Sequence, residues 1–174
     1  MNTESAFWYV DGIPTKGEWI DLYDITDTDD VLAILAEQGL VPKDEDGEPE
    51  YGGDLLVADV DGALARCFLS KYDAFDLGGY KECADWCVSN GHDLEAAAAY
   101  IDHFGSWSQS SFDDGYQGQH DSEKAFAEQL VDDLGLLHSM PDSLRHYFDY
   151  EKFARDLFIT DYVMEDGYVF RRDC

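Results

Sequence analysis

The chain has 174 residues, of which 39 are Asp or Glu and 11 are Lys or Arg, so its formal net charge at pH 7 is -28. This charge excludes nucleic acid as a direct partner and favours basic protein surfaces, such as the grooves of proteins that bind DNA or RNA. Because apolar residues make up 45% of the chain and aromatic residues 14%, the composition excludes a disordered acidic tail and predicts a packed core.

The first elements predicted from the N-terminus are two strands and a helix. Residues 6–10 (AFWYV) and 17–23 (GEWIDLY) have the aromatic and β-branched content of strands, and the intervening DGIPTKG predicts the turn of a hairpin. Residues 28–39 (TDDVLAILAEQG) predict a helix with Thr28 as N-cap and Gly39 just past its end. A polar loop at 42–54 then leads to a third predicted strand, LLVADVDG.

The remaining elements are mostly helical. Helices are predicted for 80–91, for 93–105 with Asp93 as cap, and for 122–135 with Ser122 as N-cap. Pro141 suits the first position of a further helix, DYEKFARDL continues in helical period, and FITDYVM and GYVFRR predict a terminal β-hairpin. The Gly-, Ser- and Gln-rich stretch 105–119 predicts a connecting segment between the helices expected at 93–105 and 122–135.

These elements predict an α+β fold made of three small consecutive units. We place a sheet with one helix at 1–75, a helical module at 76–110 and a mixed α/β unit at 111–174. The start MNTESAFWYV lacks a secretory signal, and no apolar run approaches the roughly 18 residues of a membrane span. We therefore expect a cytoplasmic protein with reduced cysteines and no membrane contact.

The acids are unevenly distributed along the chain. Residues 1–65 contain 17 acids and two bases, whereas residues 121–174 contain 13 acids and six bases. Five acids lie within residues 21–30 and five more within 44–50. Such crowding costs roughly 0.2–0.5 kcal/mol per like-charged pair at helical spacing. An acidic surface can simply aid solubility or suit high salt, but long spans without any base favour a specific use of the charge.

Metal and enzyme sites find little support in the sequence. DEDGE and DVDG have the acid and glycine density of calcium loops but not the ligand spacing. Cys83, Cys87 and His92 could bring three zinc ligands together, although no fourth is evident and two core thiols are the more economical interpretation. Paired carboxylates beside aromatic residues could form a glycosidase site, but among 39 acids such adjacency arises by chance. We therefore predict no catalytic residues, no metal site and no cofactor.

The C-terminal third contains a distinctive series of elements: Tyr116 and Gly118, Gly135 and Leu136, Pro141, the block Tyr147, Asp149, Ala154, Arg155, Asp156 and Leu157, and the hairpin residues Tyr168 to Phe170. Together they resemble the end of the ArdA family of antirestriction proteins. Residues 6–22 resemble the first strand pair of the family, although DGIPTKG replaces its usual Tyr-Asn-x-Gly approach to the Gly-x-Trp. Residues 54–104 match only in the order and type of elements.

This resemblance implies an elongated, three-part, non-catalytic protein that forms a homodimer. The family mimics bent B-form DNA and occupies the DNA-binding groove of Type I restriction-modification enzymes, in their specificity and methyltransferase core. An alternative target is another nuclease or a DNA-binding regulator, and an alternative class is an acidic carbohydrate-acting or carbohydrate-binding module.

The resemblance also gives roles to individual residues. The expected phosphate-mimicking residues are Asp21, Asp24, Asp27, Asp29, Asp30, Asp44, Glu45, Asp46, Glu48, Glu50, Asp113, Asp114, Asp132 and Asp133. The expected dimer residues are Ala127, Val131, Leu136, Leu137, Tyr147 and Phe148, because the helix at 122–134 and the segment 136–148 hold the matching block.

Overall fold

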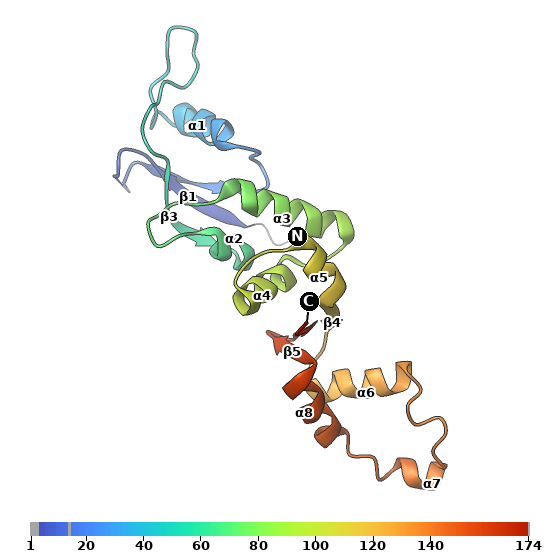
Figure 1. Ribbon diagram of the computed structural model, residues 1–174. Helices are drawn as coiled ribbons and strands as arrows, with labels where there is room; N and C mark the ends of the chain where they lie inside the picture. The colour runs from blue at the N-terminus through green and yellow to red at the C-terminus, as the bar shows by residue number, and fades with distance from the viewer. Residues whose placement is uncertain (1–3, 14, 174) are drawn as a thin grey trace. The chain divides into compact units, whose positions relative to one another are not determined.

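The computed structural model describes residues 4–13 and 15–173 and shows an α+β fold, as the sequence predicts. The chain forms two compact units, Met1–Ala98 and Ala99–Cys174, which we call the first and second unit. Each unit contains one three-stranded sheet (Figure 1). The division into three units with boundaries at 75 and 110 stays a prediction.

The first unit is built on an antiparallel sheet with the strand order β2-β1-β3. Its elements are β1 (Ser5–Tyr9), β2 (Gly17–Asp21), α1 (Thr28–Glu37), β3 (Leu56–Asp61), α2 (Ala63–Phe68) and α3 (Leu77–Asn90). The predicted hairpin of the first two strands is confirmed, with Phe7 opposite Trp19. The predicted third strand is also confirmed and pairs with β1, which therefore lies in the centre of the sheet.

Alternation along the strands decides which face of this sheet is buried. Ala6 and Trp8 on β1 and Ile20 on β2 are at most 3% exposed. The Trp8 ring meets the Phe75 ring edge-on at 5.8 Å, which joins the sheet to the segment before α3. A hydrophobic face of alternate residues thus supplies the core of the first unit.

A buried carboxylate ties the start of the chain to α2. Glu4 is 5% exposed, and its two carboxylate oxygens accept hydrogen bonds from the backbone N–H groups of Leu64 and Ala65 at 2.9 and 3.0 Å. Gly62, with φ +148°, lies against this side chain, so a Cβ there would collide with Glu4. Glu4 thereby satisfies N–H groups that α2 leaves free at its first turn.

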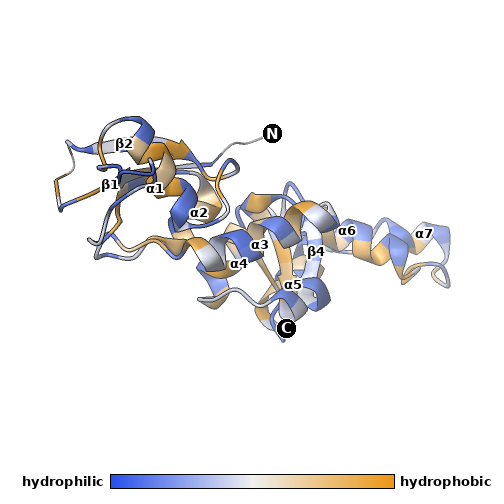
Figure 2. Cartoon of the chain, turned by 90° about the horizontal axis from the view of Figure 1, so that it is seen from above, coloured by the Kyte–Doolittle hydropathy of each residue, from blue (hydrophilic) through white to orange (hydrophobic). Residues whose placement is uncertain are grey.

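The second unit combines helices with a second antiparallel sheet of order β4-β6-β5. Its elements are α4 (Leu94–Phe104), which begins in the first unit, then α5 (Gln109–Gly115), β4 (Tyr116–Gln119), α6 (Glu123–Asp133), α7 (Asp142–Arg145), α8 (Tyr150–Thr160), β5 (Tyr162–Glu165) and β6 (Tyr168–Arg171). Phe126 from α6, Phe158 from α8 and Val169 from β6 form one core cluster. Figure 2 shows hydrophobic and hydrophilic residues alternating around α6, as a helix with one buried face requires.

Most of the expected helix ends are confirmed, and several boundaries differ. Ser122 caps α6, and Gly135 follows that helix with a positive φ of 62°. Pro141 is the residue before α7 rather than its first residue. The strand expected at 158–164 begins only at Tyr162, because α8 continues to Thr160. The expected connection at 105–119 contains α5 and β4, and α2 was not predicted.

Within residues 4–13 and 15–173, every helix is too short or too polar to cross a bilayer.

Glu4 gives the stability of the protein a distinct pH dependence. Burial raises the pKa of Glu4 above its ordinary 4.5, and this outweighs the lowering by its hydrogen bonds to Leu64, Tyr80 and Ala65. Between pH 4.5 and the higher pKa of Glu4 in the folded protein, the unfolded chain loses this proton first, which favours unfolding. Over this interval the free energy of unfolding of the wild type, relative to that of Glu4→Gln, should therefore fall as the pH rises, and it should level off above the interval. Denaturant unfolding of both proteins from pH 4 to 8 measures the difference, and a difference that grows with pH would contradict the raised pKa.

Candidate functional site

The acids at 27–30 form the start of α1. The Asp27 carboxylate accepts hydrogen bonds from the backbone N–H groups of Asp29 and Asp30 at 2.9 and 3.2 Å. The Asp30 carboxylate in turn accepts from the N–H groups of Thr26 and Asp27 at 2.7 and 3.4 Å. This reciprocal arrangement is a capping box, so Asp27 is the N-cap and the prediction of Thr28 is wrong by one residue. Thr28 is already the first helical residue.

This capping box separates the acids with a structural use from those without one. Asp27 and Asp30 hold the helix start, where the helix dipole also favours negative charge. The Asp21 carboxylate accepts a hydrogen bond from the N–H of Tyr23 at 2.8 Å. Asp24 and Asp29 are exposed, and within the described part of the chain their carboxylates accept no hydrogen bond. Their charges are available to a partner without disturbing the helix.

The second acidic group occupies a tight turn. One carboxylate oxygen of Asp44 accepts from the N–H groups of both Asp46 and Glu48 at 2.9 Å. The N–H of Glu50 donates to the Pro42 carbonyl at 2.8 Å, which closes the base of the turn. The polar loop predicted from the sequence is therefore an ordered platform held by one of its own acids.

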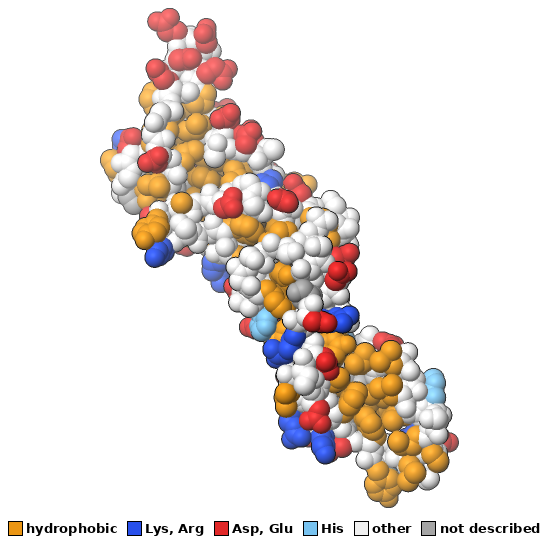
Figure 3. Space-filling view, in the orientation of Figure 1, with side chains coloured by type: hydrophobic (Ala, Val, Ile, Leu, Met, Phe, Trp, Pro, Cys, Tyr) orange, Lys and Arg blue, Asp and Glu red, His pale blue; other side chains and the backbone are white. Residues whose placement is uncertain are grey.

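The other four acids of this turn are solvent-exposed. Glu45, Asp46, Glu48 and Glu50 all belong to the exposed class. Figure 3 shows acidic side chains grouped at the tip of this loop, and more of them on the first unit below it. The turn thus presents several negative charges close together on a fixed backbone.

The fourteen acids expected to bind a target share one electrostatic property. Twelve of them are exposed, and Asp21 and Asp30 are half-buried. Among the residues that the structure describes, none of the fourteen forms an ion pair, whereas Asp11, Glu128, Glu151 and Asp142 all pair with a Lys or Arg. The charge of the expected binding residues is therefore not neutralised locally.

The four acids of the second unit lie at helix ends. Asp113 and Asp114 follow the fully buried Phe112 in α5, and Asp132 and Asp133 close α6. All four are exposed, and the Gln129 side chain donates to Asp133 at 3.4 Å.

The cysteines considered as metal ligands are core residues. Cys83 and Cys87 are both fully buried on α3, and their thiols form a hydrogen bond to each other that, together with burial, raises the pKa of Cys83. The His92 ring stacks on Trp86 at 5.3 Å. Across the described ranges, no group of three His, Cys, Asp or Glu side chains is arranged to hold a metal ion.

The expected dimer residues divide into buried and accessible ones. Ala127 and Val131 are at most 1% exposed within the second unit itself, so they hold its fold together. Leu136 and Tyr147 are exposed, and Leu137 and Phe148 are half-buried. Only these four can contact another chain directly.

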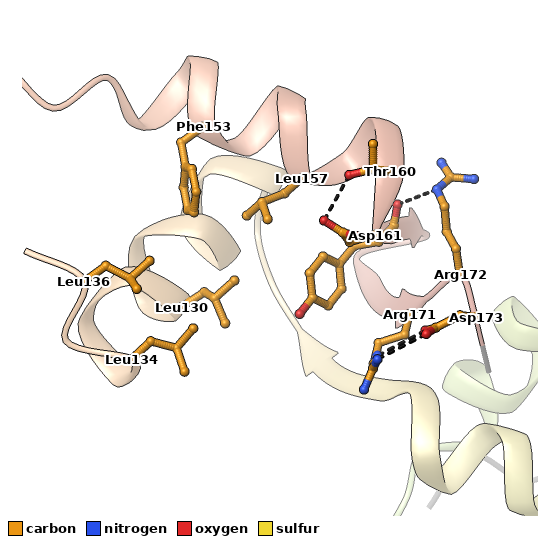
Figure 4. Close-up of a pocket in the computed structure, with 11 residues that line it drawn as sticks. Leu130, Leu134, Leu136, Phe153, Leu157, Thr160, Asp161, Arg171, Arg172 and Asp173 are labelled. Carbon is orange, nitrogen blue, oxygen red and sulfur yellow. Dashed lines mark hydrogen bonds and ion pairs between the residues drawn. The ribbon is translucent and has the colours of Figure 1, made fainter.

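Leu136 borders a groove between α6 and α8. The groove has a volume of about 380 Å³, and its apolar wall consists of Leu130, Leu134, Leu136, Phe153 and Leu157. Figure 4 shows these side chains facing one another, with the Arg171–Asp173 ion pair at the other end of the groove. Leu134 is 63% exposed, so the groove leaves apolar surface in contact with water. Exposed apolar side chains gathered in one place make this groove a candidate contact surface for another protein.

Exposed aromatic residues beside Asp21 were missed by sequence reasoning. Trp19 is 45% exposed and Tyr23 is 76% exposed. The strict alternation in GEWID around the buried Ile20 could have placed Trp19 on the outer face. Aromatic content by itself indicates a strand but not which face of the sheet carries the ring.

Small α+β units that display exposed, unpaired carboxylates define an acidic protein whose surface suits binding to other proteins. Residues 8–170 match the family described as antirestriction protein (ArdA), and the chain belongs to this family. The resemblance seen in the sequence is thus confirmed over nearly the whole chain. Family membership gives the chain an antirestriction function that involves restriction enzymes. No curated protein matches the chain.

The different roles of Asp27 and Asp24 can be separated by substitution. Asp27→Ala should lower the free energy of unfolding by about 0.5–2 kcal/mol, because α1 loses its N-cap. Asp24→Asn should change it by less than about 0.5 kcal/mol. Denaturant unfolding followed by circular dichroism measures both values, and equal losses would contradict the assignment of the capping box.

Proposed function

We propose that this protein is a non-catalytic mimic of B-form DNA that occupies the DNA-binding groove of a Type I restriction-modification enzyme. The observation that supports this most directly is the set of fourteen carboxylates without a local ion pair in the described structure. Duplex DNA carries one charge per ~1.7 Å, so a net charge of -28 equals that of roughly 48 Å of duplex. A basic groove that binds DNA would relieve the repulsion among these acids.

The ordered backbone under the acids also supports this proposal. The capping box fixes the start of α1, and the Asp44 carboxylate fixes the turn at 42–50. Charges on a preorganised backbone lose little conformational entropy on binding, and this favours affinity. Flexible acidic tails lack this advantage.

Displacement of DNA is the direct test of mimicry. The protein should displace a fluorescent duplex from a Type I methyltransferase core at near-stoichiometric amounts, and displacement should weaken steeply as salt rises. Failure to displace the duplex at low salt would rule out this target. Displacement from an unrelated nuclease instead would point to the alternative target, and salt-independent sugar binding would point to a carbohydrate module.

The dependence on individual acids should be distributed. Each of Asp24→Asn, Asp29→Asn, Glu45→Gln and Asp46→Asn should weaken displacement by less than about fivefold, equivalent to about 1 kcal/mol, and the four together by much more. The matched control neutralises four acids elsewhere, Glu128→Gln, Glu151→Gln, Asp156→Asn and Asp166→Asn, and should weaken displacement less. Equal loss in both quadruple variants would show that only net charge matters. Complete loss in one folded single variant would contradict a distributed surface.

We further propose that two chains associate through the groove between α6 and α8. Its exposed leucines and its position beside the expected dimer segment support this assignment.

Leu134→Glu combined with Leu136→Glu should convert a dimer into a monomer, because two charges would be buried in an apolar contact. Sedimentation velocity gives the mass of the particle. The control is Ile159→Glu, since Ile159 is 67% exposed and does not line the groove. A double variant that stays dimeric would place the contact elsewhere.

A further inference from the structure

The open face of the first sheet carries a row of three paired residues. Phe7 on the central strand β1 lies opposite Trp19 on β2 and opposite Asp59 on β3. Residues directly opposite each other point to the same face of a sheet. Trp19 is 45% exposed and Asp59 is exposed, while the neighbouring Ala6 is fully buried on the other face. Two aromatic rings and a carboxylate therefore share a solvent-facing surface.

The two rings hold each other in place. The Phe7 and Trp19 rings meet at 5.6 Å between centroids with an interplanar angle of 62°. The Phe7 ring also lies over Gly17, where an added Cβ would come within 2.7 Å of it. Phe7 thus occupies the space along β2 that Gly17 leaves open. Trp19 is consequently supported on one side, while nearly half of its surface stays accessible.

Further carboxylates flank these rings. In the next row, Ser5 lies opposite both Asp21 and Asp61. Adjacent strands are about 4.8 Å apart, and residues i and i+2 of a strand are about 6.7 Å apart. Asp21 therefore lies about 6.7 Å along β2 from Trp19, and Asp59 lies about 4.8 Å from Phe7 on the adjacent strand. In the described part of the chain, Asp21, Asp59 and Asp61 form no ion pair. The Asp59 carboxylate accepts a hydrogen bond from the N–H of Val60 at 2.9 Å.

We infer that this face binds an arginine side chain of the target protein, with its guanidinium over the ring of Trp19 and within reach of Asp21 or Asp59. Guanidinium is planar, weakly hydrated and always charged, so it stacks on aromatic rings and forks onto carboxylates in a way that ammonium does not. Trp is the best aromatic partner for a cation, and Trp and Arg dominate the energetics of protein interfaces. This inference rests on the proposed function, because it names the partner group that the acidic surface takes.

The aromatic face adds a preference that charge alone does not supply. Exposed carboxylates attract Lys and Arg similarly, whereas a carboxylate-flanked indole favours Arg. Asp21 belongs both to this face and to the proposed phosphate-mimicking group, so the two surfaces are continuous.

The first test compares two labelled peptides, an alternating Gly-Arg peptide and a matched Gly-Lys peptide, by fluorescence polarisation with the full chain. The wild type should bind the Arg peptide several-fold more tightly than the Lys peptide. Trp19→Leu, which keeps an apolar side chain but removes the ring, should bring the two affinities together, and Trp19→Tyr should retain much of the preference. Tyr72→Leu is the matched control, since Tyr72 is 74% exposed in the same unit but outside the sheet.

The second test uses displacement of duplex from the methyltransferase core. Trp19→Leu should weaken displacement by about tenfold, with an unchanged dependence on salt, because no charge is lost. Far-UV circular dichroism and thermal unfolding check that the variant folds, and Trp19→Met, which also removes the ring but keeps an apolar side chain, serves if it does not.

Three results would overturn the inference. One is a Trp19→Leu protein that folds and retains the Arg preference and full displacement. Another is a change in tryptophan fluorescence on addition of a neutral oligosaccharide that is absent in Trp19→Leu, without any preference for the Arg peptide. This result would assign the face to sugar. The third is a difference in sedimentation between the wild type and Trp19→Leu without any partner present, which would assign the face to a second copy of the chain. A wild type that prefers Arg but displaces no duplex would refute the proposed function and leave the Arg site standing.

Discussion

Repulsion among carboxylates is the constraint on which the rest of this structure depends. With 39 acids and 11 bases, few acids can be neutralised by ion pairs, so nearly all must stay in water. The chain meets this constraint with small units whose cores come from alternate strand residues and from the buried faces of helices such as α3, α6 and α8. Glu4 is the buried polar or charged residue within the described part, and two backbone N–H groups bind its carboxylate. The core can form because the negative charge is confined to the surface.

The same constraint links local structure to function. Asp27, Asp30 and Asp44 accept backbone N–H groups and so stabilise the segments that carry the other acids. Backbone hydrogen bonds are compatible with negative charge, whereas local ion pairs would cancel it. A surface that must attract a basic groove therefore gains order without losing charge. The Phe7–Trp19 pair adds aromatic contact area to this surface at little electrostatic cost.

The second unit shows why a sequence block does not by itself identify a contact. Ala127 and Val131 lie in the segment that resembles the family most strongly, but they fill the interior of their own unit. Leu134 and Leu136, at the end of the same helix and just beyond it, leave apolar surface exposed beside the groove. Helical period separates these two sets, and only the packing of α8 against α6 decides which face of the helix remains open.

Local rules in the sequence determined the class of the fold, the two hairpins, the helix ends at Ser122, Gly39 and Gly135, and the dominance of negative charge. These features depend on turn chemistry, capping and alternation, which act over a few residues. Tertiary structure decided the rest: the presence of α2, α5 and β4, and the burial of Val131. Each of these depends on which distant segment supplies a partner, as Glu4 does for α2, or covers a face. Such pairing over long sequence separations leaves no local pattern, so only the folded chain reveals it.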